Sequence, residues 1–302
     1  MDGLAAGEGA GAALCVLASG SGGNCSVLLT RRGGVSRVTL IDLGLSPRRT
    51  FAELHALGLR PDQIDDALVT HLDHDHFCLT WSRYLPRHAR LRLHERHARR
   101  LPALVRERLG DRVRPFAGCF DLDDGLSVSP LLMSHDEAGV STFRLDMPGF
   151  GGGSLGFCTD LGHVSMELVR HLRHCPRSGS ERVVDVLALE SNYCPKMQTA
   201  SGRPEALKRR IMGGRGHLSN EQAAEAILAV QPSAHVVLLH LSRECNEPGL
   251  AAQVHEGAAY DVTVASQFAP TPWVGVSRRD GAARAAVVSA RLAASANLFT
   301  AV

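Results

Sequence analysis

Five short apolar runs in this chain end at a residue that can bind a metal ion or transfer a proton. The endings are His71 after Thr70, His135 after Ser134, Asp160 after Thr159, Glu190 after Leu189 and His240 after Leu239. Short apolar runs are typical of buried strands, and strands that end together in a layered α/β protein place their last residues in one crevice. Five such endings exceed what chance would give, so we predict one shared site at these strand ends.

Strand-like and helix-like patterns interleave along the sequence. Apolar, β-branched runs that favour strands occupy residues 14–17, 26–29, 37–41, 66–70, 126–133, 140–145, 154–159, 183–189, 235–241 and 261–265. Helical patterns occupy residues 47–58, 94–109, 164–173, 204–212, 219–230 and 246–258. This alternation predicts an α/β protein with helices packed on sheets. A chain of 302 residues can bury a large core without structural metal, so a metal site would serve chemistry.

The net charge of +2 does not by itself indicate a nucleic-acid-binding protein. Arginine is nevertheless concentrated between residues 83 and 114, where eleven arginines accompany three acids. Such a stretch either follows the phosphates of a nucleic acid or forms a solvated, arginine-rich helix. The sequence leaves both interpretations open.

The cysteines and the N-terminal segment indicate a cytoplasmic protein. The eight cysteines include no CxxC pair and several lie in apolar runs, a pattern typical of buried free thiols in a reducing compartment. The first residues carry no Lys or Arg before a short apolar part, unlike a secretory signal. No run reaches the roughly 18 apolar residues of a membrane helix. We expect one domain over residues 1–275, followed by an Arg/Ala-rich tail or terminal helix over 276–302.

The densest group of candidate ligands is the segment Thr70-His71-Leu72-Asp73-His74-Asp75-His76-Phe77. Imidazole and carboxylate groups suit zinc, manganese and iron. Three histidines and two aspartates within six residues are poorly explained by a surface loop that is merely polar. The segment therefore predicts metal ligands.

This segment resembles the HxHxDH signature of metallo-β-lactamase-fold hydrolases, with His71, Asp73, Asp75 and His76 in the signature positions. Two further motifs of that family precede this segment, at residues 18–24 and Ile41-Asp42-Leu43-Gly44. The others come after it in the family's order: Ser134-His135-Asp136, Thr159-Asp160-Leu161-Gly162, Leu189-Glu190-Ser191-Asn192, Gly216-His217-Leu218-Ser219-Asn220 and His240-Leu241-Ser242. Over residues 14–275 the chain resembles the YycJ/WalJ-like, ribonuclease Z-related branch. The resemblance implies a four-layer αβ/βα sandwich with its metal site at the strand ends.

The resemblance also implies two divalent metal ions, zinc or manganese, that activate a bridging hydroxide. The first ion would be held by His71, Asp73 and His135, the second by Asp75, His76 and His240, with Asp160 bridging and Asp75 also assisting catalysis. Asp73 stands where the family usually has histidine. A carboxylate there shifts the preference toward manganese, or else weakens the first position so that one ion is bound. His74 occupies a variable position and is interpreted as a surface or supporting residue.

Three further features of the resemblance concern the substrate. Glu190 and His217 resemble the pair that assists leaving-group departure in ribonuclease Z-like enzymes, although Glu190 could instead pair with the basic stretch 203–215. Ser21, Gly22 and Asn24 lie in the glycine-rich opening, where a tight turn would let backbone approach the metal site or a substrate phosphate. This opening lacks the Gly-Lys-Ser/Thr ending of a nucleotide-binding loop.

The most specific function that these features indicate is a phosphodiesterase, in particular a nuclease. The resemblance suggests DNA rather than RNA, degraded from a 5′ end. Two alternatives stay open: a hydrolase of a small cyclic phosphate, lactone or thioester, and a non-catalytic metal- or DNA-binding module. The sequence gives no indication of the oligomeric state.

Overall fold

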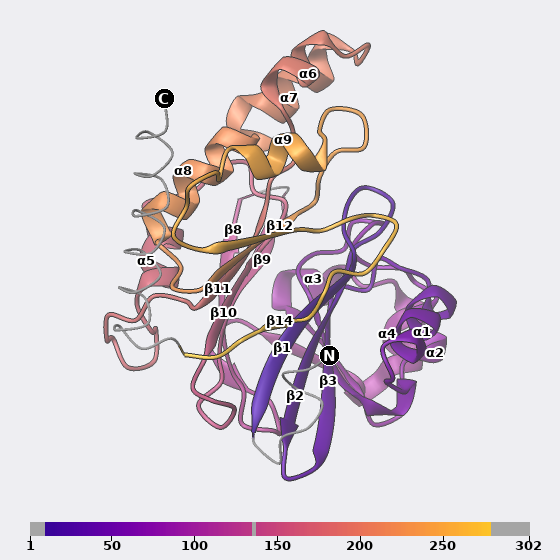
Figure 1. Cartoon of the computed structure of the whole chain (residues 1–302). Helices are drawn as coiled ribbons and strands as arrows, with labels where there is room; N and C mark the ends of the chain where they lie inside the picture. Colours follow the sequence, from indigo (N-terminus) through magenta and orange to yellow (C-terminus); the bar gives the residue numbers. More distant parts are fainter. Residues whose placement is uncertain (1–9, 135–136, 279–302) are drawn as a thin grey trace.

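The structure, a computed structural model, describes residues 10–134 and 137–278 (Figure 1). In the described chain the strands form two sheets of seven strands each. The first sheet has the order β14 (Val274–Gly275), β1 (Gly11–Ala18), β2 (Cys25–Arg32), β3 (Val35–Ile41), β4 (Ile64–Val69), β5 (Arg90–His94) and β6 (Val113–Phe116). The second has the order β13 (Asp261–Val264), β12 (His235–Leu239), β11 (Val186–Glu190), β10 (Ser154–Cys158), β9 (Val140–Asp146), β8 (Ser127–Met133) and β7 (Phe120–Asp121).

Both sheets combine an antiparallel part with a parallel part. Strands β3 to β6 run parallel in the first sheet, and β10 to β13 run parallel in the second. Parallel neighbours end at the same edge of a sheet, so the residues that follow them gather there. This topology brings distant sequence motifs to one place.

The two sheets pack face to face, and helices cover both outer faces. Buried residues of both sheets, such as Ile41 and Leu68 on one side and Phe143 and Val237 on the other, share the central core. The outer face of the first sheet is covered by α1 (Pro47–Ala56), α2 (Trp81–Tyr84), α3 (Glu95–Arg100) and α4 (Ala103–Leu109). The outer face of the second is covered by α5 (Met166–Arg173), α8 (Asn220–Val230) and α9 (Pro248–Gln253). The expected four-layer αβ/βα sandwich is therefore confirmed.

Each predicted strand overlaps an observed one, but the arginine-rich stretch 83–114 contains two strands that the sequence analysis missed. In β5 the buried Leu91 and Leu93 alternate with the half-buried Arg90 and Arg92, which is the period of a strand rather than of a helix. Arg90 and Arg92 form ion pairs with acids elsewhere in the first layer and in the β7–β8 turn. The interpretation of 83–114 as one solvated helix is wrong.

The continuous helix predicted over 94–109 is also wrong. The chain forms two short helices separated by Leu101 and Pro102. Proline has no N–H to donate and disfavours helical backbone at the residue before it, so the break occurs where Pro102 stands. The helix predicted over 246–258 is shorter than expected and ends at Gln253.

The last described residues, close to position 278, still pack against the core. Val276 is buried, and its N–H donates to the carbonyl oxygen of Ala12 at 2.8 Å. The predicted tail falls almost wholly within residues 279–302, outside the described residues, so its role stays a prediction. All eight cysteines are free thiols. No helix within residues 10–134 and 137–278 is long and apolar enough to cross a membrane.

Candidate metal centre

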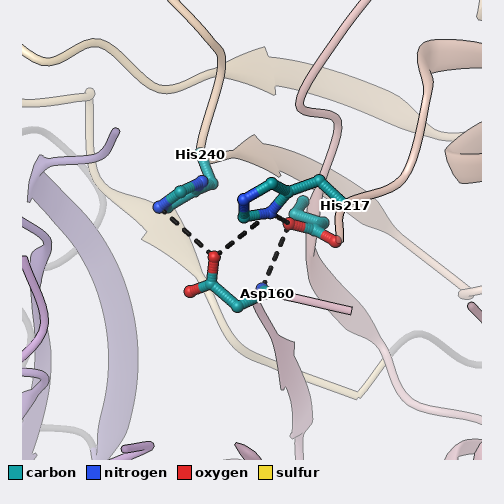
Figure 2. Close-up of side chains that lie close together, drawn as sticks. Asp160, His217 and His240 are labelled. Carbon is teal, nitrogen blue, oxygen red and sulfur yellow. Dashed lines mark hydrogen bonds and ion pairs between the residues drawn. The ribbon is translucent and has the colours of Figure 1, made fainter. Parts of the chain in front are cut away.

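The ends of four strands converge on one buried cluster of histidines and carboxylates. His71 follows β4, Asp160 follows β10, Glu190 is the last residue of β11 and His240 follows β12. Figure 2 shows Asp160, His217 and His240 pointing toward one another. These were four of the five strand endings from which the shared site was predicted. The fifth, His135, lies outside the described residues, so its ligand role stays a prediction.

Asp160 lies at the centre of the cluster, and its two carboxylate oxygens face different partners. Its Oδ2 lies 2.7 Å from His76 Nε2 and 3.9 Å from His71 Nε2. Its Oδ1 lies 3.3 Å from His217 Nδ1 and 3.4 Å from His240 Nε2. Asp160 therefore belongs to two groups of side chains whose ligand atoms lie close enough together to hold a metal ion.

Asp75 and Asp73 complete the cluster from the loop after β4. Asp75 Oδ2 lies 3.4 Å from His240 Nε2 and 3.7 Å from His76 Nε2. Asp73 Oδ2 lies 3.7 Å from His71 Nε2, and its side chain is 52% exposed. His74 points outward with 91% of its side chain exposed, in agreement with its interpretation as a surface residue.

The described residues offer ligand atoms in three groups, each of which fits a metal ion. Within every group all ligand atoms lie within 4.8 Å of one another. The groups are His71, His76 and Asp160; Asp75, His76 and His240; and Asp160, Glu190, His217 and His240. The second group is the set predicted for one of the two ions. Buried imidazole and carboxylate ligands suit zinc and manganese, so this donor set fits divalent metal ions.

The imidazoles and carboxylates of the cluster shift one another's pKa values. Burial alone would raise the pKa of Asp160, but the imidazoles of His240 and His76 outweigh burial and hold that pKa well below its usual range. Burial would lower the pKa of His76, but Asp160 and Asp42 raise it well above its usual value. A cation at this position would replace the imidazolium charge that now balances the carboxylates.

Several ligands are oriented by residues behind them. Asp42 Oδ2 accepts a hydrogen bond from His76 Nδ1 at 2.7 Å, and Asp42 Oδ1 accepts bonds from the N–H and hydroxyl of Thr70. Asn192 Nδ2 lies 3.1 Å from His240 Nδ1 and donates to the His240 carbonyl at 2.7 Å. Such contacts fix the ring orientation of a ligating histidine.

Three residues of this centre have left-handed backbone. The φ angles of Asp42, Asp160 and His240 are 63°, 53° and 56°. Non-glycine residues rarely adopt this conformation, which costs on the order of 1–3 kcal/mol each and concentrates at functional sites. Each of the three lies within two residues of a strand end, where the left-handed turn directs its side chain into the cluster.

Asp42 had no predicted role at the site, although it carries the same sequence signal as the other residues. Asp42 follows the apolar run 37–41, just as His71, Asp160 and His240 follow theirs. It contributes to the site through His76 rather than by offering a ligand atom. An acidic residue at a strand end can therefore be either a metal ligand or a residue that orients a ligand by a hydrogen bond.

We expect the variant Asp42→Asn to weaken metal binding by about 10- to 100-fold. Asparagine tolerates the left-handed backbone, so the change removes mainly the carboxylate charge behind His76 Nδ1. Competition with a chromophoric chelator would give the dissociation constants. Asp65→Asn, at a half-buried carboxylate paired with Arg37, is the matched control. Equal metal affinities for the two variants would contradict the orienting role of Asp42.

Glu190 is completely buried and holds the loops around the cluster. It accepts hydrogen bonds from the backbone N–H groups of Asp160, Leu161 and Leu218, at 3.1, 2.6 and 3.1 Å. Its Oε2 also lies 3.0 Å from His217 Nδ1. The hydrogen-bond partners of Glu190 therefore lie in the loop after β10 and in the loop before α8. None of these partners lies in the basic stretch 203–215, with which Glu190 could have paired.

His217 is the most accessible imidazole of the cluster, with 22% of its side chain exposed against 4% or less for His71, His76 and His240. Burial lowers the pKa of His217, but the carboxylates of Glu190 and Asp160 outweigh burial and raise it from 6.5 to about 9. His217 therefore has the position and the partner of a proton donor at the mouth of the site.

The glycine-rich opening lies beside the cluster, as predicted. Ser21 and Gly22 are exposed, whereas Asn24 is buried. Asn24 Oδ1 accepts from the Ser19 hydroxyl and the Gly20 N–H, and its Nδ2 lies 3.0 Å from His76 Nε2. Asn24 thus shapes the loop and supports the ligands, and contact of Ser21 and Gly22 with substrate stays a prediction.

Known proteins share this architecture. A family model described as a beta-lactamase superfamily domain matches residues 37–241. The chain belongs to this family. That match spans the ligand-bearing segments from the strand before Asp42 to His240, and it confirms the resemblance on which the site was predicted.

Curated relatives and solved structures extend the comparison over most of the chain. The chain is 26% identical to exodeoxyribonuclease WalJ of Streptococcus pneumoniae, over 84% of this chain and 91% of that protein. It is 28% identical to exodeoxyribonuclease YycJ of Bacillus anthracis, over 85% and 94%. A diphosphatase of the PhnP family superposes with a TM-score of 0.58 at 17% identity, covering 88% of this chain and 98% of that one. Human tRNase Z, short form, superposes with a TM-score of 0.56 at 16% identity, covering 85% and 98%.

Proposed function

We propose that this protein is a metal-dependent phosphodiesterase that degrades DNA from an end. The observation that carries the proposal is Asp160, which belongs to two groups of side chains that could each hold a metal ion, one with His71 and His76 and one with Glu190, His217 and His240. Two metal ions suit the displacement of an ester oxygen at phosphorus. The preference for DNA is supported by the curated relatives, two exodeoxyribonucleases that match along almost their entire length.

The residues present would hold two ions, zinc or manganese. His71, Asp73 and His135 would bind the first, Asp75, His76 and His240 the second, and Asp160 both. When bound, the ions would supply Lewis-acid stabilisation of the phosphate charge and lower the pKa of the attacking water. Asp75, with 14% of its side chain exposed, is placed to orient that water as well as to bind metal.

Glu190 and His217 would act on the leaving group. His217 reaches the solvent-facing side of the cluster and donates a proton to the departing oxygen. Glu190 acts as a positioning residue, because it has no exposed surface and holds both His217 and the backbone of Asp160. The free thiols agree with a cytoplasmic location, which we propose for the protein.

A basic arm next to the site provides a surface for the DNA backbone. The arm, residues 194–216, contains α6 (Pro195–Ala200) and α7 (Glu205–Arg210) and projects beyond the sheets (Figure 1). It carries six cations and one acid in the sequence. Arg209 and Arg210 are exposed and form no ion pair with other residues in the described parts of the chain. The arm leads through Gly214, whose φ is 75°, directly to His217.

We expect the double variant Arg209→Ser/Arg210→Ser to make DNA cleavage less dependent on salt. Each lost phosphate contact should reduce the slope of log(kcat/KM) against log salt concentration by about 1. Steady-state rates on an oligonucleotide between low and moderate salt would measure the slope. Arg170→Ser/Arg177→Ser removes the same charge from exposed positions outside both the arm and the arginine-rich stretch 83–114, and serves as the control. Equal slopes in the two double variants would argue against DNA binding by the arm.

The proposed function is tested by incubating the purified protein, with zinc or manganese, with end-labelled single- and double-stranded DNA, RNA and bis-p-nitrophenyl phosphate. We expect stepwise shortening of DNA that a chelator stops and added metal restores. Hydrolysis of the small ester alone would move the function to small-molecule phosphoesters. Two bound metals without any hydrolysis would indicate a non-catalytic module.

A further inference from the structure

The segment between β13 and β14 is fastened to the glycine-rich opening beside the metal centre. The Ser19 N–H donates to the Ser266 carbonyl at 3.0 Å. Gln267 Oε1 accepts from the Gly22 N–H at 2.7 Å, and Gln267 Nε2 donates to the Gly23 carbonyl at 2.9 Å. A Cβ atom on Gly22 would lie 2.9 Å from Gln267 Oε1, so a larger residue there would displace the Gln267 side chain. The two segments therefore form one unit.

This unit is directly connected to the metal ligands. Ser19 Oγ accepts a hydrogen bond from the His240 N–H at 2.8 Å. Asn24 Nδ2 donates to the Asp75 carbonyl at 3.1 Å. Two hydrogen bonds thus join Ser266 to the backbone of His240 through Ser19, and the residue that follows Gln267 continues this segment.

That residue is Phe268, whose surface is 75% exposed although its backbone is firmly held. The Phe268 N–H donates to Ser266 Oγ at 3.1 Å, and Arg49 Nη2 donates to the Gln267 carbonyl at 2.7 Å. Exposing a large aromatic side chain forgoes burial worth about 25 cal/mol per Å². A fixed backbone that presents an exposed ring beside a metal centre is the geometry of a binding platform.

The charges around Phe268 indicate what it binds. Arg49 contacts the same segment, and Arg48 beside it at the start of α1 is exposed and forms no ion pair within the described chain. An aromatic face next to cations is the combination with which proteins bind single-stranded nucleic acid, the ring stacking on a base and the cations following the phosphates. Exposed Ser21 and Gly22 lie on the same unit.

We propose that Phe268 is a stacking platform for the unpaired base of a DNA strand whose phosphodiester lies at the metal centre. This inference rests on the proposed nuclease function and identifies a single-stranded end as the substrate. The aromatic face tolerates any base, so binding here would not select sequence.

The inference is tested with two single-stranded oligonucleotides, one complete and one with an abasic terminal nucleotide. For wild-type protein we expect kcat/KM to be about 5- to 150-fold higher on the complete strand, the range for one stacked base. In Phe268→Ala this ratio should fall toward one, and Phe268→Trp should keep it. Leu228→Ala, at a 66% exposed residue of α8, is the control and should retain the wild-type ratio.

A binding measurement without catalysis completes the test. An oligonucleotide with terminal 2-aminopurine, added to the protein in the presence of a chelator, should lose fluorescence with wild type and with Phe268→Trp, but not with Phe268→Ala. An unchanged substrate ratio or unchanged quenching in Phe268→Ala would overturn the inference. A Phe268→Ala protein that changed its oligomeric state but retained the substrate ratio would also overturn it, because Phe268 would then belong to a contact between proteins. If wild type cleaves no DNA at all, the proposed function itself fails, a result seen before any variant is compared.

Discussion

Asp160→Ala is expected to lose metal binding and hydrolysis together. The side chain contacts four histidines within 3.9 Å and is the only carboxylate among the described residues that belongs to two of the three ligand groups. Removing it withdraws a negative charge from the place where cations would bind. Without the cations the enzyme would lose several kcal/mol of transition-state stabilisation, which corresponds to a rate loss of about 10³-fold or more.

Metal content by mass spectrometry and hydrolysis of bis-p-nitrophenyl phosphate would check this expectation. Asp62→Ala, at an exposed aspartate that pairs with Arg60, is the matched control and should retain both properties. Circular dichroism would establish that the Asp160 variant is folded. An Asp160→Ala protein that kept two metal ions would refute the bridging role of Asp160.

Arg144→Ala should produce the largest loss of stability, about 3–5 kcal/mol in the free energy of unfolding. Arg144 is completely buried, and its Nε and Nη2 donate to the two carboxylate oxygens of Asp146 at 2.9 and 3.0 Å. Its Nη1 donates to the carbonyls of Leu172, His174 and Arg182. The variant would leave a buried carboxylate and three carbonyls without this donor, which costs more than the ion pair itself contributes.

Chemical denaturation and thermal melting of the metal-free protein would measure this loss. For a domain of this size the expected fall in Tm is roughly 6–20 °C. Arg106→Ala, at an exposed arginine of α4, should stay within about 0.5 kcal/mol of wild type. Equal unfolding midpoints for the two variants would show that the buried pair does not stabilise the packing of β9 against the chain after α5.

Much of the fold could be predicted because its signals are local. The strands before Asp160 and His240 are largely apolar, as expected for strands buried on both faces, and the order of motifs indicated the family. The errors arose where local signals compete. In β5 the two-residue alternation was hidden by its arginines, and the helical pattern over 94–109 continued across Pro102, where the helix breaks.

The sequence by itself determined which side chains are available at the strand ends, because ligand chemistry and strand periodicity are properties of the residues. Only the tertiary structure decided how they combine. It placed Asp42 behind His76, gave each oxygen of Asp160 its own partners, and directed Glu190 to the loop backbone. It also set Phe268 beside the glycine-rich opening, more than 240 residues away in the chain. These relations depend on strand order and on left-handed turns at Asp42, Asp160 and His240, which long-range packing imposes against local backbone preference.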